Sequence, residues 1–161
     1  MILESTDDIF KVENPSVIIH QVNCLGYGST GLMARVANLW PELFKEYHSL
    51  CGWFKDYKAQ EEMFGTIQAL PIPKTNMILC NAFSQKFFSD TRYAIVPDAW
   101  DMILRKVVLQ TKANFKRTGI LHEFHCPSKI GIGMKPEEIE ELKDIVVEHF
   151  ATSKIKWVYH V

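Results

Sequence analysis

The sequence predicts an α/β protein, a three-layer α/β/α sandwich whose mixed sheet is parallel at its centre. Short apolar segments alternate with helical segments of ten or more residues, which favours parallel strands joined by helices. The segment 17–22 is mostly apolar, as in a strand covered on both faces. With 161 residues, of which 47% are hydrophobic, the chain is long enough for one domain, residues 1–161, with a sizeable core.

The amino-terminal elements follow from apolar spacing and from proline. Residues 1–4 are expected to start an edge strand, and residues 17–22 form a central one. Apolar residues recur at helical spacing from Thr30, and Pro41 suits the first turn of a second helix. The segment 51–62 mixes aromatic and charged residues, for which we expect core or a surface helix rather than a lid over the site.

The later elements are punctuated by glycine and proline. A turn rich in proline separates two apolar runs, which predicts a hairpin within the larger sheet. Two helices are expected to begin at prolines and to present one apolar face each. The predicted elements are the hairpin strands 64–72 and 77–83, a helix from Pro97, a strand at 119–126, a helix from Pro136 and a strand at 155–160.

Charge and motif content exclude several classes of protein. With 18 basic and 19 acidic residues, the chain has no global field that would attract nucleic acid or an anionic membrane. The four cysteines show no C-x-x-C pair, and the first residues are acidic, unlike a secretory signal, so we expect free thiols and a cytoplasmic protein without a membrane span. No zinc-ligand spacing and no G-x-S-x-G motif of a serine hydrolase occurs, so we expect no metal site. We also expect no cofactor and a monomeric protein.

Residues 23–31 are the strongest candidate for a binding loop. Gly26, Gly28 and Gly31 lie between the central strand and the next helix, where exposed amides and the positive end of the helix dipole suit a diphosphate. The alternative is an ordinary tight turn. The spacing is not G-x-G-x-x-G followed by an acidic residue, which argues against a nicotinamide dehydrogenase.

A second glycine loop, residues 129–134, is expected to face the first. Ligands of open α/β sheets bind beyond the carboxyl ends of the strands, so the loops after Val22, Phe83 and Cys126 should converge at one edge. The unhindered amides of the second loop would then clamp a cleft from the opposite side.

Several motifs in one order along the chain resemble the macrodomain family, the ADP-ribose-binding fold. They are most similar to the small bacterial, viral and animal branch that includes terminal ADP-ribose glycohydrolases. The resemblance implies a macrodomain-like sandwich. The matching motifs are Asp8-Ile9, His20–Gly26 with Gly31-Leu32, Trp40–Glu42 with Glu46-Tyr47, Asn81–Gln85, Thr91–Tyr93 and Pro127–Gly133.

The resemblance also implies roles for individual residues. Asp8, beside the Ile9 amide, would accept a hydrogen bond from the adenine amino group, and Asn23 would bind the distal ribose. Phe83, or an aromatic from Phe87 and Phe88, would cover the distal ribose or the adenine, while amides of both glycine loops would hold the diphosphate. The alternatives are that Asp8 caps its turn, Asn23 satisfies its own loop and Phe83 is core. The implied ligand-binding residues are Asp8, Ile9, Asn23, Tyr27, Gly28, Ser29, Thr30, Gly31, Leu32, Phe83, Ser84, Gly131, Ile132, Gly133, Met134 and Lys135.

The sequence departs from the glycohydrolase pattern where catalysis is concerned. In that branch a lysine after the Asn81 strand attacks the ribose, and an acidic residue past the second loop assists; these positions hold Ser84 and Lys135. Neither residue can take the expected role. The substitute candidates are Lys86 as nucleophile and His20 as a base that positions water for a phosphatase, with His122 and His125 as further histidines.

We therefore expect a viral or bacterial protein that binds ADP-ribose or a related NAD-derived nucleotide, free or attached to a macromolecule. Nucleic acid is expected as a partner only when it is ADP-ribosylated. One alternative is a hydrolase that removes ADP-ribose from protein or nucleic acid, or that dephosphorylates ADP-ribose 1''-phosphate. Another is a protein that sequesters a nucleotide signal.

Overall fold

The computed structural model describes residues 1–26, 28, 31–53, 61–85, 96–130 and 134–161. These residues form a six-stranded sheet in the order β1-β6-β5-β2-β4-β3. All neighbouring strands are parallel except β3, which pairs antiparallel with β4. The predicted mixed, centrally parallel sheet and its hairpin are confirmed. The strands are β1 (Ile2–Ser5), β2 (Ser16–Asn23), β3 (Ile67–Pro71), β4 (Met77–Gln85), β5 (Glu123–Pro127) and β6 (Trp157–His160).

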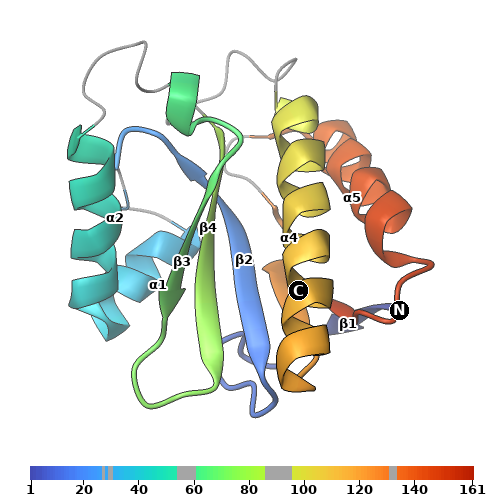
Figure 1. Cartoon of the computed structure of the whole chain (residues 1–161). Helices are drawn as coiled ribbons and strands as arrows, with labels where there is room; N and C mark the ends of the chain where they lie inside the picture. Colours follow the sequence, from blue (N-terminus) through green and yellow to red (C-terminus); the bar gives the residue numbers. More distant parts are fainter. Residues whose placement is uncertain (27, 29–30, 54–60, 86–95, 131–133) are drawn as a thin grey trace.

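Helices cover both faces of the sheet (Figure 1). α1 (Gly31–Leu39) and α2 (Pro41–Trp53) pack on one face, while α4 (Val96–Thr118) and α5 (Pro136–Phe150) pack on the other. Alternate residues of β2 point to opposite faces, because side chains alternate along a strand. Ile18 belongs to the core under α1 and α2, and Ile19 belongs to the core under α4 and α5.

The two cores contain large aromatic side chains that fix the helices on the sheet. Trp157 of β6 stacks on Phe124 of β5 and lies edge-on to Trp100 of α4. On the opposite face, Tyr47 of α2 stacks on Phe83 of β4. These buried aromatic pairs hold α2 and α4 against the two faces of the sheet.

The predicted elements are present, but three strands begin later than predicted: β3 at Ile67 instead of residue 64, β6 at Trp157 instead of residue 155, and β5 after residue 119. The predicted strand 119–126 is wrong at its start: Gly119 follows the last residue of α4, with φ of 74°, and its N–H donates to the carbonyl of Phe115. This left-handed glycine is a common helix end. β5 begins only at Glu123. The predicted element in 51–62 is described only at its edges, where α2 reaches Trp53 and Cys51 is buried.

None of the helices in the described ranges is both long and apolar enough to cross a membrane. The four cysteines are all buried and form no disulfide.

Candidate functional site

A cavity of about 880 Å³ lies at the carboxyl ends of β2, β4 and β5. These strands are parallel neighbours, so their last residues meet at one edge of the sheet. The start of α1 and the start of α5 line the cavity as well. The lining residues of these elements include His20, Gln21, Val22, Asn23, Gly31, Leu32, Gln85, Ile130, Met134 and Pro136.

An irregularity in the pairing of β2 and β4 lies among the residues that line this cavity. Gln21 pairs with Ala82, but two residues later Asn23 pairs with Gln85, so the register shifts by one residue. Such a bulge redirects side chains at the end of a strand. It places Asn23 and Gln85 opposite each other on adjacent strands, at the edge where ligands of this class of fold bind.

Asn23 is held by its own loop and by α2. Its Oδ1 accepts from the backbone N–H of Leu25 at 3.0 Å and lies 3.0 Å from the Tyr47 hydroxyl, which also lies 2.8 Å from the Asn23 carbonyl oxygen. The hydrogen bond from Leu25 is the contact expected under the alternative that the Asn23 side chain satisfies its own loop. Burial raises the pKa of Tyr47, so its hydroxyl remains a proton donor. Asn23 nevertheless lines the cavity, in a fixed orientation.

Two glycines of the first loop are required by the local geometry. Gly26 has φ of 79°, in the left-handed region. A Cβ on Gly28 would lie 2.5 Å from Cε2 of Phe44 and 2.6 Å from Cγ of Met33. The loop is therefore packed against α1 and α2 at a distance that only glycine permits.

Asp8 lies beside the cavity and is bound to a residue that lines it. Its two carboxylate oxygens accept from Nη2 of Arg35 at 2.9 and 3.0 Å, and Oδ1 also accepts from the N–H of Phe10 at 3.1 Å. The N–H of Phe10 and the Arg35 guanidinium together hold the pKa of Asp8 below its ordinary value. Asp8 therefore caps its turn. It lines a second cavity, of about 470 Å³, and not the first, and it reaches the first cavity only through its ion pair with the lining residue Arg35.

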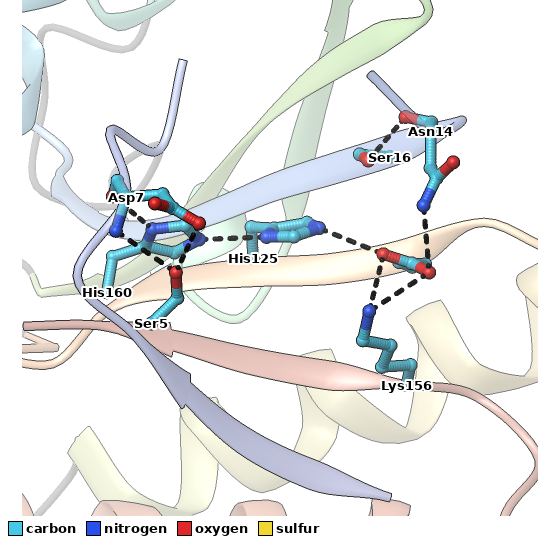
Figure 2. A network of polar contacts seen from close by, with 8 residues as sticks. Ser5, Asp7, Asn14, Ser16, His125, Lys156 and His160 are labelled. Carbon is cyan, nitrogen blue, oxygen red and sulfur yellow. Dashed lines mark hydrogen bonds and ion pairs between the residues drawn. The ribbon is translucent and has the colours of Figure 1, made fainter. Parts of the chain in front are cut away.

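A polar network fastens the Asp8 segment to the sheet (Figure 2). Nδ1 of His160 donates to the Asp7 carbonyl at 2.8 Å, and Nδ1 of His125 lies 2.8 Å from Nε2 of His160. Nε2 of His125 is 3.4 Å from Glu123, which pairs with Lys156. Burial and the neighbouring His160 lower the pKa of His125. This network also lines the second cavity, so His125 is not part of the first one.

His20 is buried and belongs to a chain of amides. Its Nε2 lies 2.7 Å from Oδ1 of Asn81, whose Nδ2 donates to Gln68 at 3.0 Å. Since the Asn81 nitrogen is the donor to Gln68, its oxygen accepts from His20, which places the proton on Nε2. Burial lowers the pKa of His20 to about 4. The imidazole lines the cavity in its neutral form, and a base of such low pKa accepts protons weakly near neutrality.

Three predicted site residues need correction. Phe83 is fully buried in the core against Tyr47, and Ser84 is also fully buried, so neither side chain reaches the cavity. The residue from the end of β4 that lines the cavity is Gln85. Lys135 is exposed, and its backbone N–H donates to Glu138 at 2.7 Å, capping α5 outside the cavity lining.

Of the other residues predicted to form the site, some line the cavity, some do not, and some lie outside the described ranges. Leu32, Gly31 and Met134 line the cavity, whereas the Ile9 side chain is buried in the core. Gly28 packs against Phe44 and His122 is half-buried, and neither is among the lining residues. The predictions for Tyr27, Ser29, Thr30, Lys86, Phe87, Phe88, Gly131, Ile132 and Gly133 fall outside the described residues.

Sequence reasoning missed Gln21, Gln85 and Arg35 as residues of the site. Gln21 and Gln85 lie within the motifs that carried the family resemblance, but no chemical role was attached to them. Arg35 follows Leu32 by three residues on α1, so helical spacing could have placed both on one face.

Comparison with known proteins identifies the fold. No family model and no curated protein matches the sequence. A protein of unknown function from Bacteroides thetaiotaomicron has a similar structure with a TM-score of 0.77, 21% identity, and 99% of this chain and 97% of that chain covered. The macrodomain of Mycobacterium tuberculosis DarG gives a TM-score of 0.72 at 16% identity, with 100% and 98% covered. Thermosipho africanus DarTG, solved in complex with ADP-ribose, gives 0.67 at 17% identity, with 96% of this chain and 40% of that chain covered. This chain has the macrodomain fold.

Proposed function

We propose that this chain binds ADP-ribose or a related NAD-derived nucleotide, free or attached to a macromolecule. The observation that carries the proposal is the cavity at the carboxyl edge of β5, β2 and β4, between the starts of α1 and α5. Its volume of about 880 Å³ is within the usual range for a ligand of this size. The complex of DarTG with ADP-ribose supports this class of ligand, because the two chains share a fold.

The charges around the cavity suit a dianionic ligand. Arg35, Lys129 and Lys143 line it, together with the acidic Glu4 and Glu140. Lys143 pairs with Glu140 at 3.0 Å, and Arg35 pairs with Asp8. The lining thus carries three basic and two acidic side chains, a small local excess of positive charge that would favour a diphosphate although the net charge of the chain is -1.

Asp8 is the proposed contact for the adenine amino group. A carboxylate has about four lone-pair positions, so it can accept a further N–H while it keeps Arg35 and Phe10. The diphosphate is assigned to the amides of residues 27–31 and 131–134, and this assignment stays a prediction. Asn23, fixed by Tyr47, is the proposed contact for the distal ribose.

We favour binding over turnover because of the residues that the described part of the cavity presents. The side chain from the end of β4 is the carboxamide of Gln85, which is not a nucleophile, and the imidazole of His20 is neutral with a low pKa. Lys86, the substitute nucleophile, lies outside the described residues. The hydrolase and phosphatase alternatives therefore depend on Lys86 or on substrate-assisted water.

Calorimetric titration with ADP-ribose tests the proposal. We expect saturable binding, a rise in melting temperature with ligand, and a loss of about tenfold in affinity for Asp8→Asn, which removes a charge-assisted hydrogen bond. Asp7→Asn is the matched control, because it makes the same change of charge at the neighbouring residue, whose carboxylate accepts from Ser5 and is not the partner of Arg35. Absence of heat and of any thermal shift at millimolar ADP-ribose would refute the proposal.

Incubation with ADP-ribosylated protein, ADP-ribosylated DNA and ADP-ribose 1''-phosphate separates a binding protein from an enzyme. We expect retention of the modified macromolecule without release of ADP-ribose or phosphate. Release that Lys86→Ala abolishes would establish the hydrolase alternative. A dissociation half-life of hours for free nucleotide would instead favour sequestration.

A further inference from the structure

Two histidines of neighbouring strands join the segment that carries Asp8 to the sheet (Figure 2). His160, the last residue of β6, has its Nδ1 2.8 Å from the carbonyl oxygen of Asp7. Its Nε2 lies 2.8 Å from Nδ1 of His125 in β5. On the far side of the His125 ring, Nε2 lies 3.4 Å from Oε2 of Glu123. We call His125 and His160 the histidine pair.

The acceptors at the two ends fix where the protons of the histidine pair lie. A carbonyl oxygen only accepts, so Nδ1 of His160 carries a proton, and in the neutral ring Nε2 is then an acceptor. Nδ1 of His125 must therefore donate to it, which leaves Nε2 of His125 as a bare acceptor. This nitrogen is buried and has no hydrogen-bond partner among the described residues. It faces Glu123, whose ionised carboxylate cannot donate.

The charges around the histidine pair come from several elements. The charged side chains that line the second cavity with it are Glu4 of β1, Asp7, Asp8, Lys11 and Glu13 of the following segment, Glu123 of β5 and Lys156 before β6. The strand neighbours of His125 are apolar, Ile18 of β2 and Val158 of β6. Glu123 is already paired with Lys156. Burial and the neighbouring His160 therefore lower the pKa of His125 more than Glu123 raises it, so His125 is neutral near pH 7.

The histidine pair has room for one added proton and not for two. The first can bind Nε2 of His125, where it would lie between that nitrogen and the carboxylate of Glu123. A second would place two N–H groups and two positive charges across a distance of 2.8 Å, where a hydrogen bond needs one donor and one acceptor. His125 is 4% exposed and His160 is half-buried, so His160 is the ring that can move into solvent. Its movement would break the contact with Asp7.

We propose that the histidine pair is an acid-sensitive switch, which holds the segment of Asp7 and Asp8 on the sheet near neutral pH and releases it in acid. Asp8 forms the ion pair with Arg35, a residue that lines the first cavity, so release of the segment also disturbs that cavity. The effect on ligand rests on the proposed function, in which Asp8 contacts the adenine. The release itself does not depend on any ligand.

Hydrogen exchange of the free protein measures the release. The N–H groups of Phe10 and Lys11 donate to Oδ1 and to the carbonyl oxygen of Asp8, so they exchange when this segment opens. After correction for the intrinsic effect of pH on exchange, the opening equilibrium constant should rise about three- to tenfold from pH 7.5 to pH 5.5, because a released histidine binds a proton near its ordinary pKa of about 6.5. His20 stays largely neutral over this range, since its pKa is about 4.

His160→Asn tests the histidine pair, with His149→Asn as the matched control. Asparagine keeps a donor for the Asp7 carbonyl but takes up no proton, so the opening constant should change by less than about twofold. His149 lies 2.7 Å from Asp101 and is not among the described residues that line either cavity, so His149→Asn should keep the wild-type rise. His125→Asn keeps a donor for Nε2 of His160 and should also reduce the rise, which provides a second variant if His160→Asn does not fold.

Titration with ADP-ribose at both pH values separates the switch from the proposed function. We expect affinity to fall at pH 5.5 in the wild-type protein and in His149→Asn, and to fall less in His160→Asn. An opening constant that does not depend on pH in the wild-type protein, or that rises equally in both variants of the histidine pair, would overturn the switch and keep the proposed function. Acid-dependent opening in a protein that binds no ADP-ribose would keep the switch and overturn the proposed function. Equal affinity at both pH values despite opening would overturn the link between the switch and the ligand.

Discussion

Removal of the Tyr47 hydroxyl tests how the candidate site is held in place. Tyr47 is fully buried, and its hydroxyl lies 2.8 Å from the carbonyl oxygen and 3.0 Å from Oδ1 of Asn23. One proton is shared between these two acceptors. In Tyr47→Phe the ring and its stacking on Phe83 remain, while the donor is lost.

The expected cost follows from the contacts that remain. Asn23 Oδ1 still accepts from the N–H of Leu25, so the main loss is the hydrogen bond from Tyr47 to the Asn23 carbonyl oxygen. The net value of the hydrogen bond and the partial desolvation of that acceptor amount to about 1–2 kcal/mol. For a chain of this length, that free energy lowers the melting temperature by about 3–6 °C.

Tyr159→Phe is the matched control for this measurement. Tyr159 is 5% exposed in the opposite core, and among the described residues its hydroxyl has no hydrogen-bond partner. Deleting that hydroxyl should change the free energy of unfolding by less than about 0.5 kcal/mol or raise it. Chemical denaturation of both variants gives the two values under the same conditions.

Ligand titration of Tyr47→Phe completes the test. Without the Tyr47 donor, Asn23 Oδ1 loses one of its hydrogen bonds and is held less firmly, so ADP-ribose affinity should fall together with stability. Equal unfolding free energies for Tyr47→Phe and Tyr159→Phe would refute the claim that this hydroxyl fixes the Asn23 loop.

Three further predictions follow from the same structure. Gly28→Ala should destabilise the protein by about 1–3 kcal/mol, because its Cβ would overlap Phe44, whereas Gly52→Ala in α2 meets no atom within 4 Å and should stabilise it by about 0.5–1 kcal/mol in the same denaturation assay. The pKa of His20 is about 4 in the folded protein and near 6.5 in the unfolded chain. The stabilisation by the neutral ring is therefore fully present above pH 6.5, and about 3 kcal/mol of the free energy of unfolding is lost as the pH falls toward 4. Unfolding measured across this range should be less dependent on pH in His20→Gln, and an identical dependence would contradict the assignment. The four buried cysteines should resist a thiol reagent in the native state and react after unfolding, since burial raises the pKa of Cys80 to about 12.

The sequence was sufficient for the elements whose pattern is determined locally. The apolar run of β2 and the prolines that begin α2 and α5 predicted their elements because burial on both faces and the fixed φ of proline act within a few residues. The start of β5 was placed too early, since the left-handed Gly119 that ends α4 resembles a turn before a strand. Local pattern does not distinguish these two uses of glycine.

The inner surface of the site was less predictable than its position. The edge where the loops converge follows from strand direction, but the register shift between Gln21 and Asn23 depends on pairing with a strand about 60 residues away. That shift placed Gln85 in the cavity, where position in the motif had suggested Ser84. The sequence also left open whether Phe83 belongs to the core or to the site, because that depends on packing against Tyr47, a distant residue of α2.

The arrangement of Asp8 and Arg35 has a consequence for nucleotide recognition. The pair joins the start of the chain to α1, and Arg35 also lies 4.8 Å from the centre of the Phe10 ring. Asp8 is thereby held in its ionised form in the free protein, since Arg35 and the N–H of Phe10 lower its pKa. An adenine amino group would meet a carboxylate that is already charged and oriented, so binding requires no deprotonation of Asp8. ADP-ribose affinity should therefore be insensitive to the titration of Asp8 between pH 5 and pH 8, and any loss of affinity in that range must come from another group.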